Sequence, residues 1–416
     1  MQAMKATFDA LDVARAGVLT PAAGMREPAV TVPGFRLSLH ADPAALGREW
    51  RAFQEHADCT VFQTHEWLST WQRTIGAPAG TRPAIVAGRD AAGSLLFLFP
   101  LAIEASGGAP TLTWLGSTLN DYNAPLLAAD FSRRFDATQF AALWRDVATL
   151  LCHNGMAFDV IRLEKMPARV GSQANPFIGL GVRANASGAY STLLGPDWEA
   201  FYAEKRSATT RRRDRTKRKK LGELGEVSFV TPDAAALPST LDRLFTQKSA
   251  AFVHMGVADI FARPGYRDFF SALATDTTTR QLVHVSRLDT GDIRAAVNLG
   301  LVFRDTYYHV LASYDGGEVA RFGPGAAHLH ELMRYAIDRH CTVFDFTIGD
   351  EPYKRDWCDT EIMLFDHVSA ATARGWPRVA WSHGRSSIKR VIKQTPALWA
   401  LYIRVRGALA ALRGHG

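Results

Sequence analysis

The stretch from Gln281 to Ile348 constrains the fold more than any other part of the chain. Three apolar segments are joined by tight turns at Asp289–Asp292 and Arg304–Asp305, which predicts an antiparallel three-strand meander. The amphipathic segment "GAAHLHELMRYAIDRH" then predicts a helix, and "VFDF" predicts one more strand. Strands and helices therefore mix in one sheet-based domain of the α/β (α+β) class.

The first half of the chain has a similar plan. "DPAALGREWRAFQEHA" and "DATQFAALWRDVATLLCHNG" predict helices, while "PAIVAGRDAAGSLLFLFPLAIE" predicts two strands around a turn. Two helix-to-strand joins each pass through a histidine to Phe-Asp, at Asp159 and Asp345, which weakly indicates an internal duplication. The pattern predicts two α/β domains.

The length of 416 residues also favours two or three domains. We expect a basic helix, 197–222, near the junction of the two halves. The predicted ranges are a mobile arm at 1–35, an N-terminal domain at 36–190, a C-terminal domain at 191–370 and a basic amphipathic tail at 371–416.

Composition excludes several classes of protein. The four cysteines form no CxxC pair, so neither a disulfide framework nor a structural zinc site is expected. His328 and His330 are two residues apart and do not share a helix face, so no metal site is predicted. The longest apolar run, Leu95–Ile103, is too short to span a bilayer, and no signal peptide is visible. We expect a cytoplasmic protein, with the tail either packed on the body or lying peripherally on the inner membrane.

The net charge of +7 is concentrated in one segment. Residues 205–220 hold ten Lys and Arg against one acid. Such a run can be a solvated helix face, or it can bind phosphate of a nucleotide sugar, of a lipid-linked sugar or of RNA such as tRNA. All three interpretations stay open at this point.

A glycine-rich segment, Gly323-Pro324-Gly325-Ala326, opens the helix that follows the meander. Unpaired N–H groups at a helix start bind anions, and glycine lets the anion approach closely. A pyrophosphate suits this position, and an ordinary Gly-Pro loop is the alternative.

These motifs resemble the Fem-like branch of the GNAT acyltransferases. The similarity is greatest to the BioF2-like (CelD-like) acetyltransferase domain of proteins associated with cellulose and exopolysaccharide synthesis. The pattern is carried by Pro324-Gly325, Asp345-Phe346, Gly349-Asp350 and Tyr353-Lys354, within residues 190 to 370. The segment "CTVFQTHEWLSTWQRTIG" resembles the family's N-terminal helix and extends the likeness to about residue 40. The chain departs from the general GNAT loop at Ala320, where that loop has Gln or Arg.

The resemblance implies two GNAT-like domains, each a mixed, mostly antiparallel sheet flanked by helices. It implies acetyl-CoA as co-substrate, with its pyrophosphate on Gly323, Pro324, Gly325 and Ala326 and no metal. An acceptor amine must lose a proton and the leaving thiolate must gain one, so the candidate catalytic residues are Asp345, Tyr353 and Lys354. Each of the three has an alternative role in the structure. Asp345 can pair with an arginine or cap a loop, Tyr353 can pack in the core, and Lys354 can lie in solvent.

Candidate substrate-binding residues are Asp121, Tyr122 and Asp350, with the acceptor between the halves; a plain polar loop at Asp121–Asn123 is the alternative. The predicted function is acyl-CoA-dependent N-acylation of an amine acceptor, a sugar or polysaccharide precursor. Two alternatives remain open. One is a non-catalytic GNAT-fold partner of a polysaccharide synthase, and the other is a Fem-like transferase that uses aminoacyl-tRNA.

Overall fold

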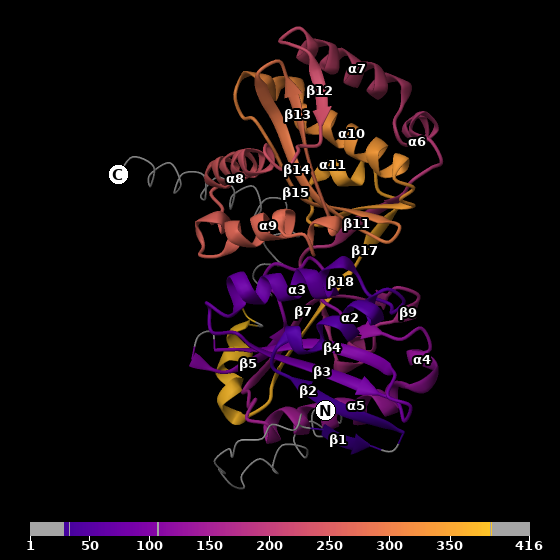
Figure 1. Ribbon diagram of the computed structural model, residues 1–416, viewed down its shortest axis with the longest axis vertical. Helices are drawn as coiled ribbons and strands as arrows, with labels where there is room; N and C mark the ends of the chain where they lie inside the picture. The colour runs from indigo at the N-terminus through magenta and orange to yellow at the C-terminus, as the bar shows by residue number, and fades with distance from the viewer. Residues whose placement is uncertain (1–28, 33, 106–107, 383, 385–416) are drawn as a thin grey trace. The chain divides into compact units, whose positions relative to one another are not determined.

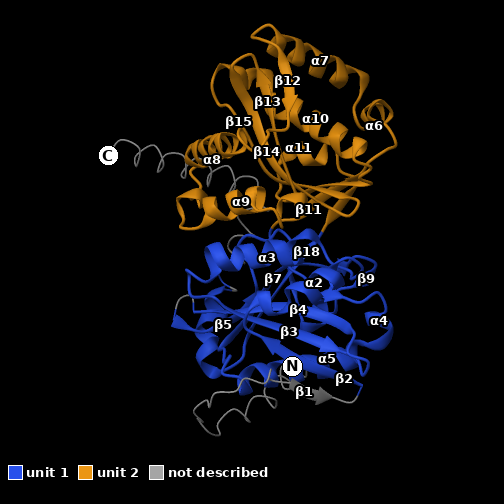
Figure 2. Ribbon diagram, in the orientation of Figure 1, with its two compact units in different colours: residues 1–186, 363–390 blue, residues 187–362, 391–416 orange. Residues whose placement is uncertain are grey.

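The computed structural model describes residues 29–32, 34–105, 108–382 and 384 (Figure 1). The chain divides into two compact units (Figure 2). Unit 1 comprises residues 1–186 and 363–390, and unit 2 comprises residues 187–362 and 391–416. Among the helices of the described ranges, none combines the length and the apolar character that crossing a bilayer requires.

Unit 1 is a mixed, mostly antiparallel sheet with the strand order β1-β2-β3-β4-β5-β7-β18-β10, and β6 pairs with β4. Its core is dominated by aromatic rings and aliphatic side chains between the sheet and α5, including Phe97, Trp114 and Phe177. The elements are β1 (Ala29–Val32), β2 (Phe35–His40), η2 (Pro43–Leu46), α2 (Gly47–Gln54), η3 (Val61–Gln63), α3 (His65–Trp71), η4 (Gln72–Gly76), β3 (Arg82–Arg89), β4 (Leu95–Glu104), β5 (Thr111–Trp114), β6 (Leu126–Leu127), α4 (Phe131–Arg134), α5 (Ala137–His153), β7 (Val160–Pro167), β8 (Arg169–Val170), β9 (Gln173–Ala174), η6 (Pro176–Leu180), β10 (Arg183–Ala184), β18 (Leu364–Ala370) and η10 (Ala373–Gly375).

Unit 2 repeats this plan with the strand order β12-β13-β14-β15-β16-β11-β17. A meander of three antiparallel strands leads through α10 to β16, which is parallel to β15, as the turn pattern of this segment predicts. The elements are β11 (Ala189–Leu193), α6 (Trp198–Lys205), α7 (Ala208–Gly222), β12 (Val227–Val230), α8 (Leu237–His254), η7 (Ile260–Ala262), α9 (Tyr266–Thr275), η8 (Arg280–Leu282), β13 (Val283–Thr290), β14 (Ile293–Phe303), β15 (Thr306–Tyr314), η9 (Glu318–Phe322), α10 (Pro324–Asp338), β16 (Val343–Ile348), α11 (Pro352–Arg355) and β17 (Thr360–Ile362).

Each unit thus contains one parallel β-α-β crossover inside an otherwise mostly antiparallel sheet, β5-α5-β7 in unit 1 and β15-α10-β16 in unit 2. The α/β fold class with two units of similar plan is confirmed. The detail of the duplicated Phe-Asp join is wrong, because Asp159 precedes β7 whereas Asp345 is the third residue of β16. The two crossovers are alike in the parallel pairing of the strands that they join, and not in the position of the Phe-Asp dipeptide.

Two boundaries of the structure differ from the expected ranges. Residues 364–370 form β18, which pairs with β7 in unit 1, so the chain leaves unit 2 after residue 362. Ala29–Val32 is a strand paired with β2, although it lies in the segment expected to be a mobile arm; residues 1–28 and the tail from 385 lie outside the described residues.

The predicted single helix over 197–222 is wrong. The chain breaks at Arg206, whose backbone is extended, and Ser207 begins α7 by accepting a hydrogen bond from the Thr210 N–H. A serine hydroxyl competes for backbone N–H groups and therefore favours a helix start over a helix interior.

Candidate functional site

The sheet of unit 2 opens between β15 and β16. The two strands pair in parallel only at Thr306–Tyr308 and Val343–Asp345, whereas β11 pairs with the other edge of β16 as far as Ile348. The pairing of β15 with β14 shifts register between Leu299 and Leu301, just past the last β16 contact. A bulge of this kind bends a strand and increases its twist, so β15 turns away from β16 here.

Asp345 stands at the last paired position and is buried, with 6% of its surface exposed. Its Oδ1 accepts a hydrogen bond from the Thr347 N–H at 2.7 Å. Thr347 has a left-handed backbone, with φ of +59°, which is rare for a β-branched residue. The buried acid in the middle of the strand therefore stabilises a strained kink, and such strain concentrates at functional sites.

Lys354 is buried beneath this kink, with 4% of its surface exposed. Its ammonium donates to the Ile348 carbonyl at 2.9 Å and the Thr347 carbonyl at 3.4 Å, and pairs with Glu351 at 3.0 Å. These contacts are those of a residue that positions the end of β16. Glycine suits position 349, because residues with a side chain rarely adopt its φ of +136°.

The other candidates of this segment lie nearer to solvent. The Tyr353 side chain packs edge-on against Phe346 with 6.3 Å between ring centroids and is 39% exposed. Burial, followed by the negative charge of Glu351, raises the pKa of the Tyr353 phenol, so the phenol is protonated at neutral pH. Asp350 is exposed, and its carboxylate accepts from the Gly188 N–H at 3.4 Å.

The start of α10 provides backbone donors close to this opening. Gly323 is the N-cap in a left-handed conformation, Pro324 occupies the first turn, and no side chain caps the helix. A Cβ on Gly325 would lie 3.3 Å from the Tyr314 ring at the end of β15, so a larger residue would crowd the helix start. The segment predicted to bind a pyrophosphate thus has the local form of an anion-binding helix start.

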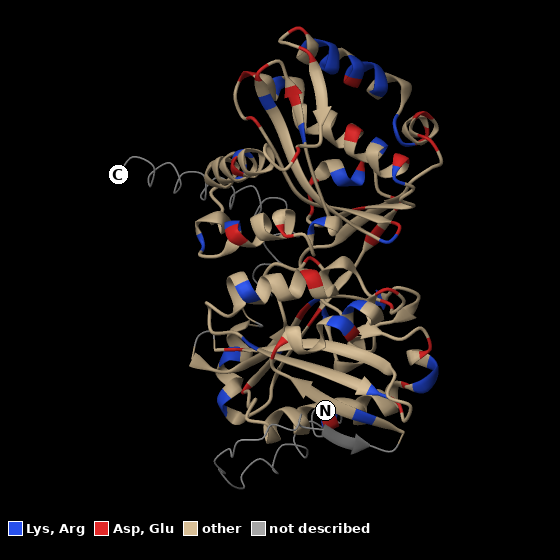
Figure 3. Cartoon of the chain, in the orientation of Figure 1, with Lys and Arg blue, Asp and Glu red and all other residues tan. Residues whose placement is uncertain are grey.

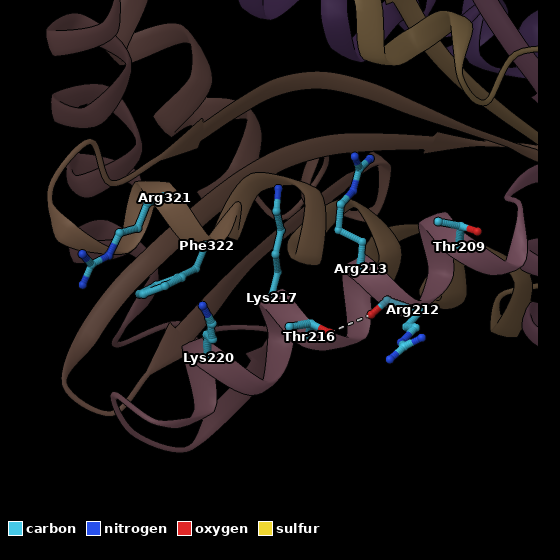
Figure 4. Close-up of a pocket in the computed structure, with 8 residues that line it drawn as sticks. All are labelled: Thr209, Arg212, Arg213, Thr216, Lys217, Lys220, Arg321 and Phe322. Atoms are coloured by element: carbon cyan, nitrogen blue, oxygen red, sulfur yellow. Dashed lines mark hydrogen bonds between the residues drawn. The ribbon is translucent and has the colours of Figure 1, made fainter.

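The basic helix α7 lies beside this helix start. An ideal Cβ on Gly323 would lie 3.8 Å from the Lys217 Nζ. In Figure 4, Arg213, Lys217 and Lys220 extend from the same side of α7, whereas Arg212 points to the other side; Arg321 is carried by η9. They line a pocket of about 530 Å³ together with threonines and an aromatic ring; its lining residues are Thr209, Arg212, Arg213, Thr216, Lys217, Lys220, Arg321 and Phe322.

Lys and Arg occupy much of the length of α7 (Figure 3). Only Leu221 of this helix is buried, so α7 contributes little to the core of unit 2. The sequence predicts the basic stretch but not its proximity to Arg321. The signal for Arg321 is weak, since it is a single arginine two residues before Gly323.

Two further ionisable groups lie near the opening, and the sequence did not indicate either of them as a site residue. Lys248 on α8 donates to the Ala312 carbonyl of β15 at 3.0 Å. His309 is buried at the bulge of β15, and burial followed by the charges of Lys354 and Lys248 lowers its pKa to about 3. The available signal is that Lys248 follows Leu244 by four residues, which places it on the buried face of an amphipathic helix.

The remaining candidates, Asp121 and Tyr122, belong to unit 1, whereas all the residues above belong to unit 2. The Tyr122 ring is 3% exposed and packs edge-on against Phe62 at 5.6 Å, so it contributes to the core. Asp121 is half-buried in the adjoining turn. In the described part of the chain, no group of three or more His, Cys, Asp and Glu side chains is arranged to hold a metal ion.

Comparison with known proteins agrees with this architecture. A family model described as "Acetyltransferase (GNAT) domain" matches residues 208–355. The fold resembles the crystal structure of FemX, with a TM-score of 0.55 and 12% identity over 78% of this chain and 96% of that chain. It also resembles a conserved protein of unknown function from Bacteroides thetaiotaomicron VPI-5482, with a TM-score of 0.50 and 10% identity over 80% of this chain and 98% of that chain. No curated protein matches the sequence.

The matched range runs from the start of α7 to the end of α11 and contains the strand opening, the α10 start and the kink at Thr347. Residues 208–355 of unit 2 therefore match a GNAT acetyltransferase domain, and the two solved structures share the fold.

Proposed function

We propose that this protein is an acyl-CoA-dependent N-acyltransferase that transfers an acetyl group to an amine acceptor. The observation that carries the proposal is the α10 start. It has no side-chain cap, lies next to Lys217 and follows the diverging end of β15 through η9. In the proposal, the pyrophosphate of acetyl-CoA lies against Gly323, Pro324, Gly325 and Ala326 and accepts from the Gly325 N–H, since the Ala326 N–H already donates to the Gly323 carbonyl at 3.1 Å. The acyl end then reaches the opening.

In the proposed reaction, the acceptor amine attacks the thioester carbon, the C–S bond breaks, and an amide and free CoA form. The amine loses one proton, directly or through water, to the carboxylate of Asp345. The CoA thiolate gains one proton from the Tyr353 phenol, whose raised pKa favours the protonated form at neutral pH. Lys354 keeps the end of β16 in place through its two carbonyl contacts.

The acceptor class is the less direct part of the proposal. The motif pattern at Pro324-Gly325, Asp345-Phe346, Gly349-Asp350 and Tyr353-Lys354 resembles the BioF2-like, CelD-like acetyltransferases, which supports a sugar or polysaccharide precursor amine in cellulose or exopolysaccharide synthesis. We propose a cytoplasmic site of action, since acetyl-CoA is a cytoplasmic metabolite.

Calorimetric titration of acetyl-CoA tests the donor site. We expect micromolar binding to the wild type and its loss in Gly325→Trp, because the new side chain crowds the α10 start. Gly179→Trp is the matched control, since nothing lies within 4 Å of a Cβ at Gly179 in unit 1. No binding to the wild type, or equal binding by both variants, contradicts the proposal. Binding without acetyl transfer to any amine favours the non-catalytic partner of a polysaccharide synthase.

A second candidate function is aminoacyl transfer from tRNA, and α7 is the observation that favours it. The helix has many exposed cations and a single buried residue, Leu221, which suits a polyanion. Tight tRNA binding that weakens steeply between 50 and 200 mM salt, together with no acetyl-CoA binding, supports this candidate. Weak tRNA binding that does not change when the Lys and Arg residues of α7 are replaced contradicts this candidate.

A further inference from the structure

The sheet of unit 2 has different helices on its two faces. Ser286 on β13 contacts His328 of α10 at 3.0 Å, whereas the next residue, Arg287, donates to Thr240 of α8 at 3.3 Å. Successive side chains of a strand point to opposite faces, so α8 and α10 cover opposite faces of the sheet. Figure 1 agrees with this, because the ribbons of α8 and α10 lie on either side of β13 to β15.

Helix α8 is attached along the part of β15 that lies beyond its pairing with β16. Gln247 accepts from the Ser313 hydroxyl at 2.8 Å, and the Lys248 ammonium donates to the Ala312 carbonyl at 3.0 Å. Lys248 therefore reaches the diverging part of β15 from the face opposite α10. The charges of Glu351 and Lys354, which follow β16, both act on the pKa of its ammonium.

Lys248 differs from Lys354 in making no ion pair within the described part of the chain, although the negative charge of Glu351 acts on it from farther away. Lys354 pairs with Glu351 at 3.0 Å. Among the described residues, the contacts of the Lys248 ammonium are the Ala312 carbonyl and the Phe252 ring, with no carboxylate within 4.0 Å. Burial is the main cause that lowers the pKa of Lys248. A cation removed from water without an anion is costly, and a bound anion would remove that cost.

We propose that Lys248 binds an oxyanion of the amine acceptor, a carboxylate or a phosphate. This inference rests on the proposed acyltransferase function and adds the charge class of its acceptor. The donor's phosphates are assigned to α7 and the α10 start, on the other face of the sheet. Lys248 is left for the second substrate, with two of its three N–H donors available for an oxyanion.

Three amino sugars that differ only at C6 test the inference: glucosamine, glucosaminuronic acid and glucosamine 6-phosphate. Their binding is measured by calorimetry without acetyl-CoA, so the result does not depend on the donor site or on turnover. We expect at least one of the two anionic sugars to bind wild type about tenfold more tightly than glucosamine, since a charge-assisted hydrogen bond contributes on the order of 1.5 kcal/mol or more. The preferred anion identifies the source of the oxyanion, carboxylate or phosphate.

We expect Lys248→Met to lose the preference for the anionic sugar and Lys248→Arg to keep part of it. Arg145→Met removes one exposed positive charge from α5 in unit 1 and is the matched control for net charge. Equal binding of the three sugars to wild type, no binding of any of them, or an unchanged preference in Lys248→Met overturns the inference. A wild type that binds no acetyl-CoA, or that transfers no acetyl group, contradicts the proposed function. The preference for an anionic sugar can still be measured in that case.

Discussion

Three buried histidines in unit 2 predict that this unit loses stability in mild acid. His284, His309 and His328 are 4%, 9% and 2% exposed. Burial lowers the pKa of each to about 3, and nearby positive charge adds to the effect, from Arg339 at His284 and from Lys354 and Lys248 at His309. In the unfolded chain the same groups titrate near the ordinary value of about 6.5.

The sign of the effect follows from these values. Below pH 6.5 the unfolded chain takes up protons that the folded unit refuses, so stability is full above pH 6.5 and falls as the pH drops toward 3. Each histidine costs about 1.4 kcal/mol per pH unit in this window, or about 2 kcal/mol at pH 5. Three such groups cost up to about 6 kcal/mol, which is comparable with the whole stability of a domain.

Replacing one histidine tests the magnitude. We expect His328→Gln to reduce the acid dependence by about one third, to a slope of about two protons instead of three between pH 6 and 4. The measurement is hydrogen exchange of peptides from β13 and α10 at several pH values, corrected for intrinsic exchange, which reports unit 2 separately from unit 1. The exposed His153 in unit 1 is the control, and His153→Gln should leave the slope unchanged. A wild-type unit 2 whose opening free energy is flat from pH 7 to 5, or an equal slope in His328→Gln, refutes the reasoning.

Three further substitutions test other parts of the structure. Tyr353→Phe should lower acetyl transfer about 100-fold or more while the Kd for acetyl-CoA stays the same, because only proton donation is lost; equal steady-state turnover would contradict the role. Gly349→Ala should lower the free energy of unfolding by about 1–3 kcal/mol in denaturant titration, because its Cβ would lie 2.4 Å from a carboxylate oxygen at a φ of +136°; an unchanged midpoint would show that the segment relaxes. Ser207→Ala should lower the free energy of opening that hydrogen exchange reports for α7 by about 1 kcal/mol, because the helix loses its N-cap. Ser207→Asp should restore the protection.

Local patterns account for the parts of the fold that the sequence predicts. The hairpin turns of the meander, the capped start of α5 at Asp136 and the Gly-Pro start of α10 all depend on residues within one or two turns of each other. Their backbone preferences act in the unfolded chain as well, so they can be recognised without neighbours.

The candidate site is predicted less completely. Pro324-Gly325 and Asp345 lie where the β15-α10-β16 crossover brings them, as the order of motifs indicates. The backbone contacts of Lys354, however, depend on a left-handed residue at Thr347, and no sequence rule places a threonine there. Tyr122 also had a polar-loop signal, yet packing against Phe62 buries it.

By itself, the sequence determined the order of elements from β13 to β16, the two-unit plan, the glycine-rich helix start and the concentration of positive charge in residues 205–220. These follow from periodicity, turn chemistry and charge, which are properties of short segments. Only the tertiary structure decided that β18 returns to pair with β7, that Arg321 and Lys217 line one pocket, and that Lys248 makes no ion pair with any residue that the structure describes. These depend on contacts between segments far apart in the chain, where burial and pairing are set by the whole fold rather than by local preference.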